Sequence, residues 1–207
     1  IEDTWSVVGM RGTGSQDFVV EDVFVPAAHT CFLGDPAVEP NPLYDRRLVF
    51  VNLFTAVAAN SLGIARGAID AFVDMAGRET STRSADLLRD RPAVQARLAE
   101  AEAILNAARA YVVAAVGRLW DEAGGGADPS LALAQARLAI VHAMREAVRT
   151  VDLVFHAAGT NAIYTRNPLE RHFRDIHVAV QHNAAFPAQY ESAGKVLLGL
   201  RPADMGW

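Results

Sequence analysis

The sequence contains a single cysteine, Cys31, among its 207 residues. One thiol excludes an internal disulfide framework and is typical of a protein from a reducing compartment. No uninterrupted apolar run reaches the roughly 20 residues of a membrane-spanning helix, although 51% of the residues are hydrophobic. The first residues, IEDTWSVVG, are neither basic nor continuously apolar, so they do not resemble a signal peptide. We therefore expect a cytoplasmic protein with no membrane partner.

A surplus of positive charge is also missing, because the formal net charge is −5. Nucleic-acid-binding surfaces are usually basic, and this sequence has no basic stripe with interleaved aromatic residues. The zinc-site motifs HExxH and CxxC do not occur either. We expect neither a nucleic-acid partner nor a metal site.

Residues 1–26 differ in character from the rest of the chain. A glycine-rich turn is followed by β-branched and aromatic residues in rough alternation, a pattern typical of strands; these residues are Phe18, Val20, Val23 and Val25. We interpret 1–26 as two short antiparallel strands, the remnant of a β-domain whose beginning is missing, since the chain starts in mid-pattern with Ile1. Residues 27–42 are rich in proline and are predicted to be a linker.

Residues 43–207 are predicted to form a helical domain. Apolar residues recur at intervals of three and four over 43–78, 92–123 and 129–158, and shorter helices are expected after Pro168 and over 189–198. The second stretch is a heptad seam suited to antiparallel packing, with Val94, Leu98, Ala101, Leu105, Ala108, Val112, Ala115 and Leu119 on the seam. Long helices joined by short loops indicate a mainly α protein built as an antiparallel up-down four-helix bundle.

Three of the six histidines, His172, His177 and His182, lie in the segment 166–189. Pro168 is predicted to begin a helix that cannot continue past Pro187, so His182 should lie near its end. An imidazole titrates near neutral pH and suits a hydrogen-bond donor or proton carrier. Histidines at helical spacing are more often surface or hydrogen-bonded core residues than catalysts, so the spacing alone does not assign them a function.

The order of WSVVGMRGTGSQDFVVEDVFVP, long helices, AAGTNAIY and NPLERHFRDIHVAVQH resembles the C-terminal half of flavoproteins with the acyl-CoA dehydrogenase fold. The similarity covers about residues 5–200 and is greatest to the flavin-dependent monooxygenase branch. Many dehydrogenases carry a catalytic glutamate where this chain has Asn183, and an amide cannot accept a proton as that base does. Others keep the base on the first long helix, but residues 54–63 contain no Asp or Glu.

This resemblance implies a two-component monooxygenase that hydroxylates an aromatic or similar small molecule with O2 and reduced FMN or FAD, supplied by a separate flavin reductase. It implies that His182 lies beside the flavin and that Asn183 adds a polar contact. It further implies that Arg78, or Arg83 as a rival, contacts the flavin phosphate across a subunit interface. Gly159 and Thr160 match a glycine-rich loop near the flavin.

Two alternatives stay open at this point. The chain may be part of an acyl-CoA dehydrogenase, which desaturates an acyl-CoA with FAD. It may also be a fragment that acts only as an oligomerisation module, since helical domains of this fold pair into dimers and tetramers. In that case we expect the 207 residues alone to be inactive and to bind flavin weakly or not at all.

Overall fold

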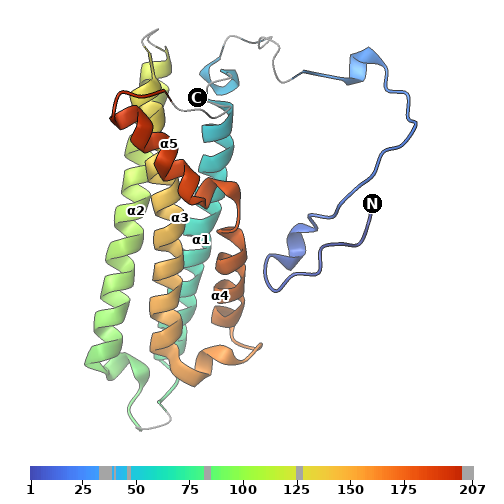
Figure 1. Cartoon of the computed structure of the whole chain (residues 1–207). Coiled ribbons are helices and arrows are strands. Elements are labelled where there is room, and N and C mark those ends of the chain that lie inside the picture. Colours follow the sequence, from blue (N-terminus) through green and yellow to red (C-terminus); the bar gives the residue numbers. More distant parts are fainter. Residues whose placement is uncertain (33–38, 40, 46–47, 82–84, 125–127, 202–207) are drawn as a thin grey trace.

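The computed structural model describes residues 1–32, 39, 41–45, 48–81, 85–124 and 128–201. These residues contain five α-helices and no β-strand, so the chain is mainly helical as expected (Figure 1). The helices are α1 (Val49–Ala76), α2 (Pro92–Gly124), α3 (Ser130–Ala158), α4 (Pro168–Ala179) and α5 (Pro187–Leu197). Short 3-10 helices lie between or before them, namely η1 (Arg11–Thr13), η2 (Ala27–His29), η3 (Pro42–Tyr44), η4 (Leu88–Asp90), η5 (Gly159–Ile163) and η6 (Asn183–Ala185).

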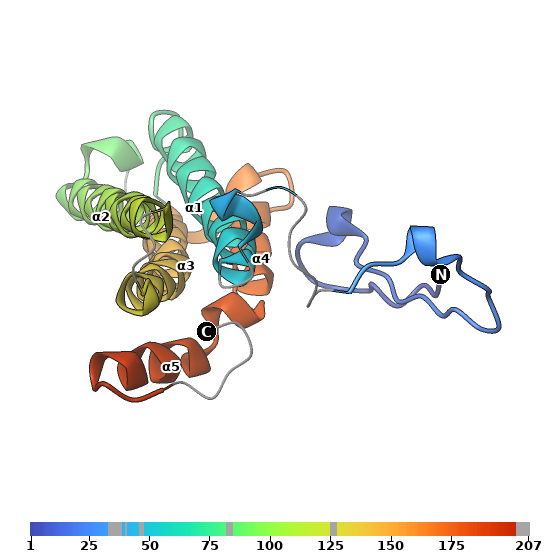
Figure 2. The ribbon, with the colours of Figure 1, turned by 90° about the horizontal axis from the view of Figure 1, so that it is seen from above.

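Of the long helices, α2 runs antiparallel to both α1 and α3, and α3 contacts each of the other four helices (Figure 1). Helix α4 lies along α1 and α3, while α5 crosses α3 obliquely on the outside (Figure 2). Many of the buried residues of α3 are alanines, which allow its backbone to approach its neighbours closely. Three long helices with two short ones are therefore observed, and the regular four-helix arrangement that we expected is not confirmed.

The heptad seam of α2 is buried as predicted. All of its positions except Leu98 are buried, and Leu98 packs against the core at partial exposure. The seam faces α3, because the two helices follow one another through a short connection and pack along their length. The Asp128 carboxylate accepts a hydrogen bond from the Ser130 amide at 3.1 Å, so it satisfies a free N–H at the start of α3.

The predicted ends of two helices need correction. Helix α1 begins at Val49 rather than at residue 43, because Pro42–Tyr44 forms the separate 3-10 turn η3. Helix α4 ends at Ala179, well before Pro187, and Pro187 instead occupies the first turn of α5. Proline is favoured there because the first helical N–H has no partner within the helix.

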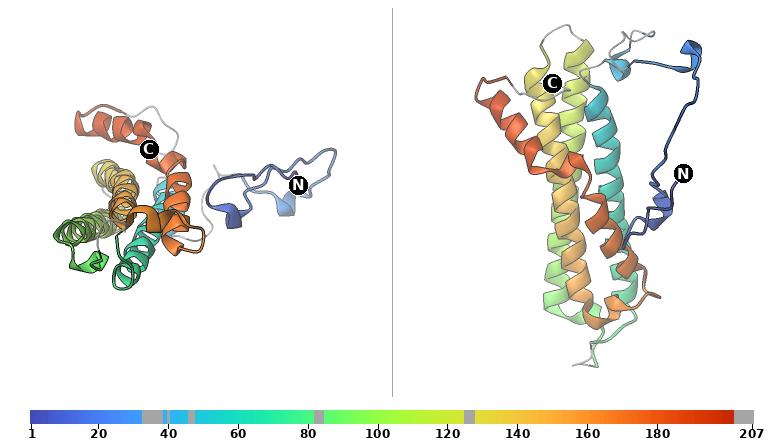
Figure 3. Two further views of the ribbon diagram at one scale, coloured as in Figure 1. Left: turned by 90° about the horizontal axis from the view of Figure 1, so that it is seen from below. Right: turned by 45° about the vertical axis from the view of Figure 1, so that its right-hand side comes forward.

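The prediction of two strands in residues 1–26 is not confirmed. The described residues show one isolated bridge in this segment, between Glu2 and Asp17, and apart from the short 3-10 helix η1 the chain runs without regular structure beside the bundle (Figure 3). Most of its apolar side chains are exposed, with Phe18 at 74% and Phe24 at 88%. Two strands without a third strand or a covering layer are marginal in water, which accounts for the missing ladder.

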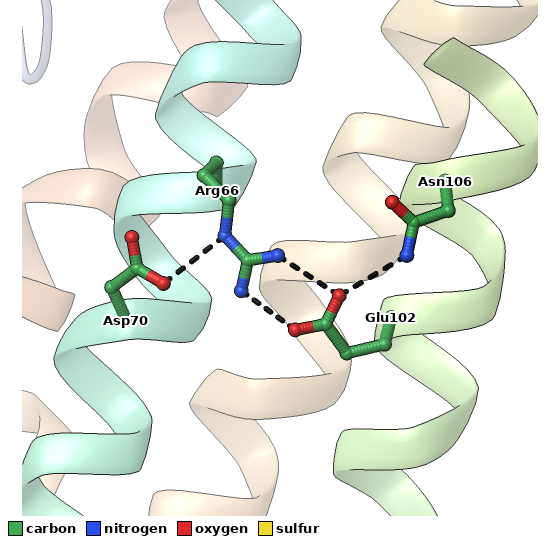
Figure 4. Close-up of polar contacts among 4 residues, drawn as sticks. All are labelled: Arg66, Asp70, Glu102 and Asn106. Atoms are coloured by element: carbon green, nitrogen blue, oxygen red, sulfur yellow. Dashed lines mark hydrogen bonds and ion pairs between the residues drawn. The ribbon is translucent and has the colours of Figure 1, made fainter. Parts of the chain in front are cut away.

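A polar network joins α1 to α2 on the face away from α3 (Figure 4). The Arg66 guanidinium donates to both carboxylate oxygens of Glu102, at 2.9 and 2.8 Å, and its Nε donates to Asp70 at 3.1 Å. Asn106 donates to the same Glu102 carboxylate at 3.3 Å. The hydrogen bond from Arg66 lowers the pKa of Glu102 because it stabilises the ionised carboxylate.

Of the described helices, α1 alone is long and apolar enough to cross a membrane by length and composition. Core helices of helical bundles meet the same criterion. One side of α1 packs on α3 and α4, and it buries Phe54, Ala65, Ile69 and Phe72.

Candidate active site

Helix α4 and the turn after it position His182. The Asn167 side chain accepts a hydrogen bond from the Leu169 amide at 3.0 Å and Pro168 follows, so the sequence NPLE specifies where the helix starts. Leu169 and Ile176 are fully buried against the bundle and hold α4 in place. The chain leaves the helix after Ala179, and His182 adopts an extended conformation at the start of η6.

The surroundings of His182 define which of its ring nitrogens is free. Nδ1 accepts a hydrogen bond from the Ala184 amide at 3.2 Å. An accepting Nδ1 places the proton of the neutral ring on Nε2. Nε2 has no hydrogen-bond partner among the described residues, and the side chain is exposed. The ring therefore keeps a free N–H donor at Nε2.

An aromatic residue from α1 lies against the same imidazole. The rings of Phe54 and His182 meet edge to face with centroids 5.7 Å apart, and Phe50 lies 6.1 Å from Phe54. Phe54 is only 7% exposed, whereas Leu53 and Phe186 are 59% and 46% exposed. His182 thus lies beside apolar side chains of α1 and at the start of η6, the turn that ends at the exposed Phe186.

Phe54 was missed as a site residue by the sequence analysis. Its helical spacing predicted only that it belongs to the buried face of α1. Nothing in the sequence pairs it with His182, because the contact depends on how α4 and η6 pack beside α1. The neighbouring Asn183 is exposed, and its main-chain carbonyl accepts from Gln189 at 3.2 Å.

The three histidines of the segment do not come together. His172 is half-buried on α4. Its ring packs closely against Gly67 of α1, because a Cβ added to this glycine would lie 2.8 Å from the His172 Cε1 atom. Burial, and then the charge of Arg171, lower the pKa of His172. His177 Nδ1 lies 2.8 Å from the Phe173 carbonyl, and its Nε2 lies 3.5 Å from Asp152.

The residues expected to bind the flavin phosphate lie at the other end of the bundle. Arg78 follows the end of α1 and forms an ion pair with Asp74, and Arg83 is outside the described residues. Phe54 and the end of α1 at Ala76 are separated by roughly 33 Å at 1.5 Å per residue. A single chain therefore does not bring Arg78 to His182.

Gly159 and Thr160 also lie at that far end, where α3 stops. Gly159 has φ +61° and ψ −142°, a backbone conformation that only glycine adopts readily. It caps α3 as predicted, and both residues are exposed. Among the described residues no group of three His, Cys, Asp or Glu side chains is arranged to hold a metal ion.

Comparison with known proteins identifies the class. The sequence profile of the family described as "Acyl-CoA dehydrogenase, C-terminal domain" matches residues 55–187, and the chain belongs to this family. The resemblance drawn from the sequence motifs is confirmed, and within the family the chain is similar to flavin-dependent monooxygenases.

Two curated relatives show this similarity. The chain is 33% identical over 205 residues to the indole-3-acetate monooxygenase of Acinetobacter baumannii, covering 98% of this chain and 52% of that protein. It is 33% identical over 218 residues to HsaA of Mycobacterium tuberculosis, the oxygenase subunit of a flavin-dependent monooxygenase, covering 99% and 54%. The chain thus spans about half the length of the curated relatives that it matches.

Two solved structures are also similar to this chain. The 3-HSA hydroxylase from Rhodococcus sp. RHA1 superimposes with a TM-score of 0.85 at 29% identity, covering 100% of this chain and 56% of that chain. XiaF from Streptomyces sp., solved in complex with FADH2 and glycerol, also has a TM-score of 0.85, at 26% identity, with 98% and 54% covered.

Proposed function

We propose that the chain is the C-terminal, helical part of the oxygenase component of a two-component flavin monooxygenase. The whole protein would use reduced flavin and O2 to hydroxylate an aromatic or similar small molecule. The observation that carries the proposal is the free Nε2–H of His182 beside apolar side chains of α1, in a chain whose relatives are flavin-dependent monooxygenases.

The residues around His182 fit a flavin. Phe50, Leu53 and Phe186 expose flat or aliphatic apolar area, which suits a planar aromatic ring. Exposed apolar side chains of this kind mark a surface that a ligand or another part of a protein covers. Reduced flavin, FMN or FAD, supplies the activation of dioxygen when it is bound.

His182 and its neighbours then have distinct roles. The Ala184 amide fixes the ring with its proton on Nε2, so His182 holds a hydrogen-bond donor toward the reacting oxygen or the substrate. The exposed amide of Asn183 adds a polar contact next to it. The apolar side chains of α1 exclude water from the reacting atoms once the site is covered.

The competing activity is acyl-CoA dehydrogenation, which needs a carboxylate base beside the flavin. The chain has Asn183 at one of the two positions that such a base takes in the resembling enzymes. It has no Asp or Glu in residues 54–63 of α1, at the other position. The same site therefore favours hydroxylation.

We infer that the protein assembles as a dimer or tetramer through its helical domain. A groove of about 640 Å³ between α1 and α2 is lined mainly by apolar residues, among them Leu62, Leu105, Val112 and Val116. Arg78, Gly159 and Thr160 lie at the end of the bundle opposite His182. They can therefore contact a flavin beside His182 only if that histidine belongs to a second subunit. Arg83 stays a rival to Arg78 for the phosphate contact, on the resemblance alone.

We also propose the domain division 1–26, 27–42 and 43–207, with residues 1–26 completing a β-domain supplied by the rest of the protein. The exposed Phe18, Phe24 and Val20 support this proposal, since a β-layer would bury them. The partners are a flavin reductase and a small-molecule substrate, and the location is the cytoplasm. The 207-residue chain alone should be inactive.

The test uses the full-length protein supplied with reduced flavin and O2. Transient absorbance that differs from oxidised flavin, together with hydroxylated product, is expected for a monooxygenase. His182→Ala should lower product formation by about 100-fold or more. His29→Ala, at an exposed histidine of η2, should not. Flavin reduction by an acyl-CoA without oxygen would instead establish the dehydrogenase.

A further inference from the structure

A cavity of about 340 Å³ lies between the loop 9–13 and the first turns of α4, away from His182. Three arginines line it, Arg11 from the loop and Arg171 and Arg174 from α4, and Asp175 is its only acidic lining residue. Arg171 is separated from the end of α4 by roughly 12 Å of helix. The proposed flavin site does not use any of these side chains.

The loop is held in one conformation around Met10. The Met10 amide donates to the Asp175 carboxylate at 2.6 Å. The Met10 carbonyl accepts from the Trp5 indole at 3.1 Å and from the Thr13 hydroxyl at 2.9 Å. Met10 itself has φ +54°, a left-handed conformation that is uncommon for a residue with a side chain. Such conformations persist only where the surroundings fix them, and they cluster at ligand sites.

Close packing adds to this rigidity. A Cβ on Gly9 would lie 2.3 Å from the Arg174 carbonyl oxygen, so the loop sits directly on the backbone of α4. Arg174 is held by the Glu170 carboxylate and by the Val8 carbonyl. These contacts fix the position of the loop, and therefore of the Arg11 backbone, relative to α4.

The charges in the cavity are not balanced. Glu170 offsets Arg174, and the Asp175 carboxylate, which accepts from the Met10 amide, leaves one of the two charges of Arg11 and Arg171 without a counter-charge in the lining. Arg11 and Arg171 have no hydrogen bond or ion pair with any residue that the structure describes. Two unpaired guanidinium groups that line one cavity attract an anion, and their planar forks match the oxygens of a carboxylate or a phosphate.

We propose that this cavity is a binding site for an oxyanion, the carboxylate or phosphate group of a small molecule, with Arg11 and Arg171 as its ligands. Arg174 and Asp175 position the loop over α4 rather than bind the anion. The proposal concerns binding alone and does not depend on the proposed monooxygenase activity.

The experiment is calorimetric titration of the full-length protein at low ionic strength with inorganic phosphate and, separately, with phenylacetate. Arg11→Gln and Arg171→Gln should each raise the dissociation constant of the bound anion by at least about fivefold. Arg118→Gln is the matched control, because Arg118 is an exposed arginine of α2 with no partner among the described residues. It should leave the dissociation constant within about twofold.

The two probes separate the sources of the anion. Tighter binding of phenylacetate assigns the site to an organic acid, and tighter binding of phosphate assigns it to a phosphorylated molecule; either supports the proposal. Thermal unfolding of each variant verifies that it is folded. The proposal is overturned if the wild type binds neither probe, or if Arg118→Gln weakens binding as much as Arg171→Gln.

Discussion

The attachment of the N-terminal segment to α4 depends on Gly9. In Gly9→Ala the new Cβ would lie 2.3 Å from the Arg174 carbonyl oxygen and 2.9 Å from the Asp175 amide nitrogen. Both are backbone atoms of a helix and cannot move aside, so the loop must lift away. Lifting breaks the 2.6 Å hydrogen bond from Met10 to the Asp175 carboxylate. A hydrogen bond to a charged group contributes about 2 kcal/mol, which corresponds to about 30-fold in the ratio of docked to undocked chains.

Trypsin cleavage after Arg11 measures this change, because the rate follows the population of the open form when opening is fast. We expect Gly9→Ala to be cleaved about 30-fold faster than wild type. Amide exchange at Met10 should accelerate in parallel. Gly12→Ala is the control, since a Cβ there meets no atom within 4 Å. Equal cleavage of wild type and Gly9→Ala, or equal acceleration in Gly12→Ala, would refute the reasoning.

Three further predictions concern the stability of the bundle. The pKa of His172 is lowered by burial and by Arg171. The neutral ring therefore contributes fully to the free energy of unfolding above the ordinary pKa of about 6.5, and this contribution is lost as the pH falls below that value. His172→Gln should flatten the decline in urea midpoint between about pH 7.5 and 5.5, and an unchanged slope would contradict this. Ile176 is fully buried, and Ile176→Ala should lower the free energy of unfolding by about 2–5 kcal/mol. Ile163 is 59% exposed, and Ile163→Ala should lower it by less than about 0.5 kcal/mol. Similar losses at both sites would count against the observed core. The side chains of Arg66 and Glu102 are 40% and 37% exposed, so solvent screens their ion pair. A double-mutant cycle with Arg66→Gln and Glu102→Gln should therefore give a coupling energy of about 1 kcal/mol or less. A coupling energy well above this range would show that solvent screening is weaker than the exposure suggests.

The sequence by itself determined the helices and most of the core. Apolar spacing located α1, α2 and α3, and the seam from Val94 to Leu119 is buried because a period of three and four residues leaves one helix face for the neighbour. The glycine at 159 and the proline at 168 marked a helix end and a helix start correctly, because each is tied to a local backbone requirement. The motifs also identified the family.

Local signals failed where a partner from elsewhere in the chain decides the outcome. The alternation in residues 1–26 predicted strands, but a strand needs a neighbour to pair with, and the described residues offer none. The end of α4 was placed too late for a related reason. The Ala184 and Ala185 side chains pack into the core beside Phe54 and Leu133, which favours a turn over another turn of helix.

The candidate site likewise depended partly on the sequence and partly on the tertiary structure. The sequence singled out His182 by its motif, but only the tertiary structure placed Phe54 against its ring, because that contact depends on α1 and η6 meeting. The free Nε2 follows instead from the local hydrogen bond of the Ala184 amide to Nδ1. The structure likewise separated His172, His177 and His182, which the sequence places close together. It also brought Arg11 to Arg171, since that cavity exists only where the Gly9 loop rests on the backbone of α4.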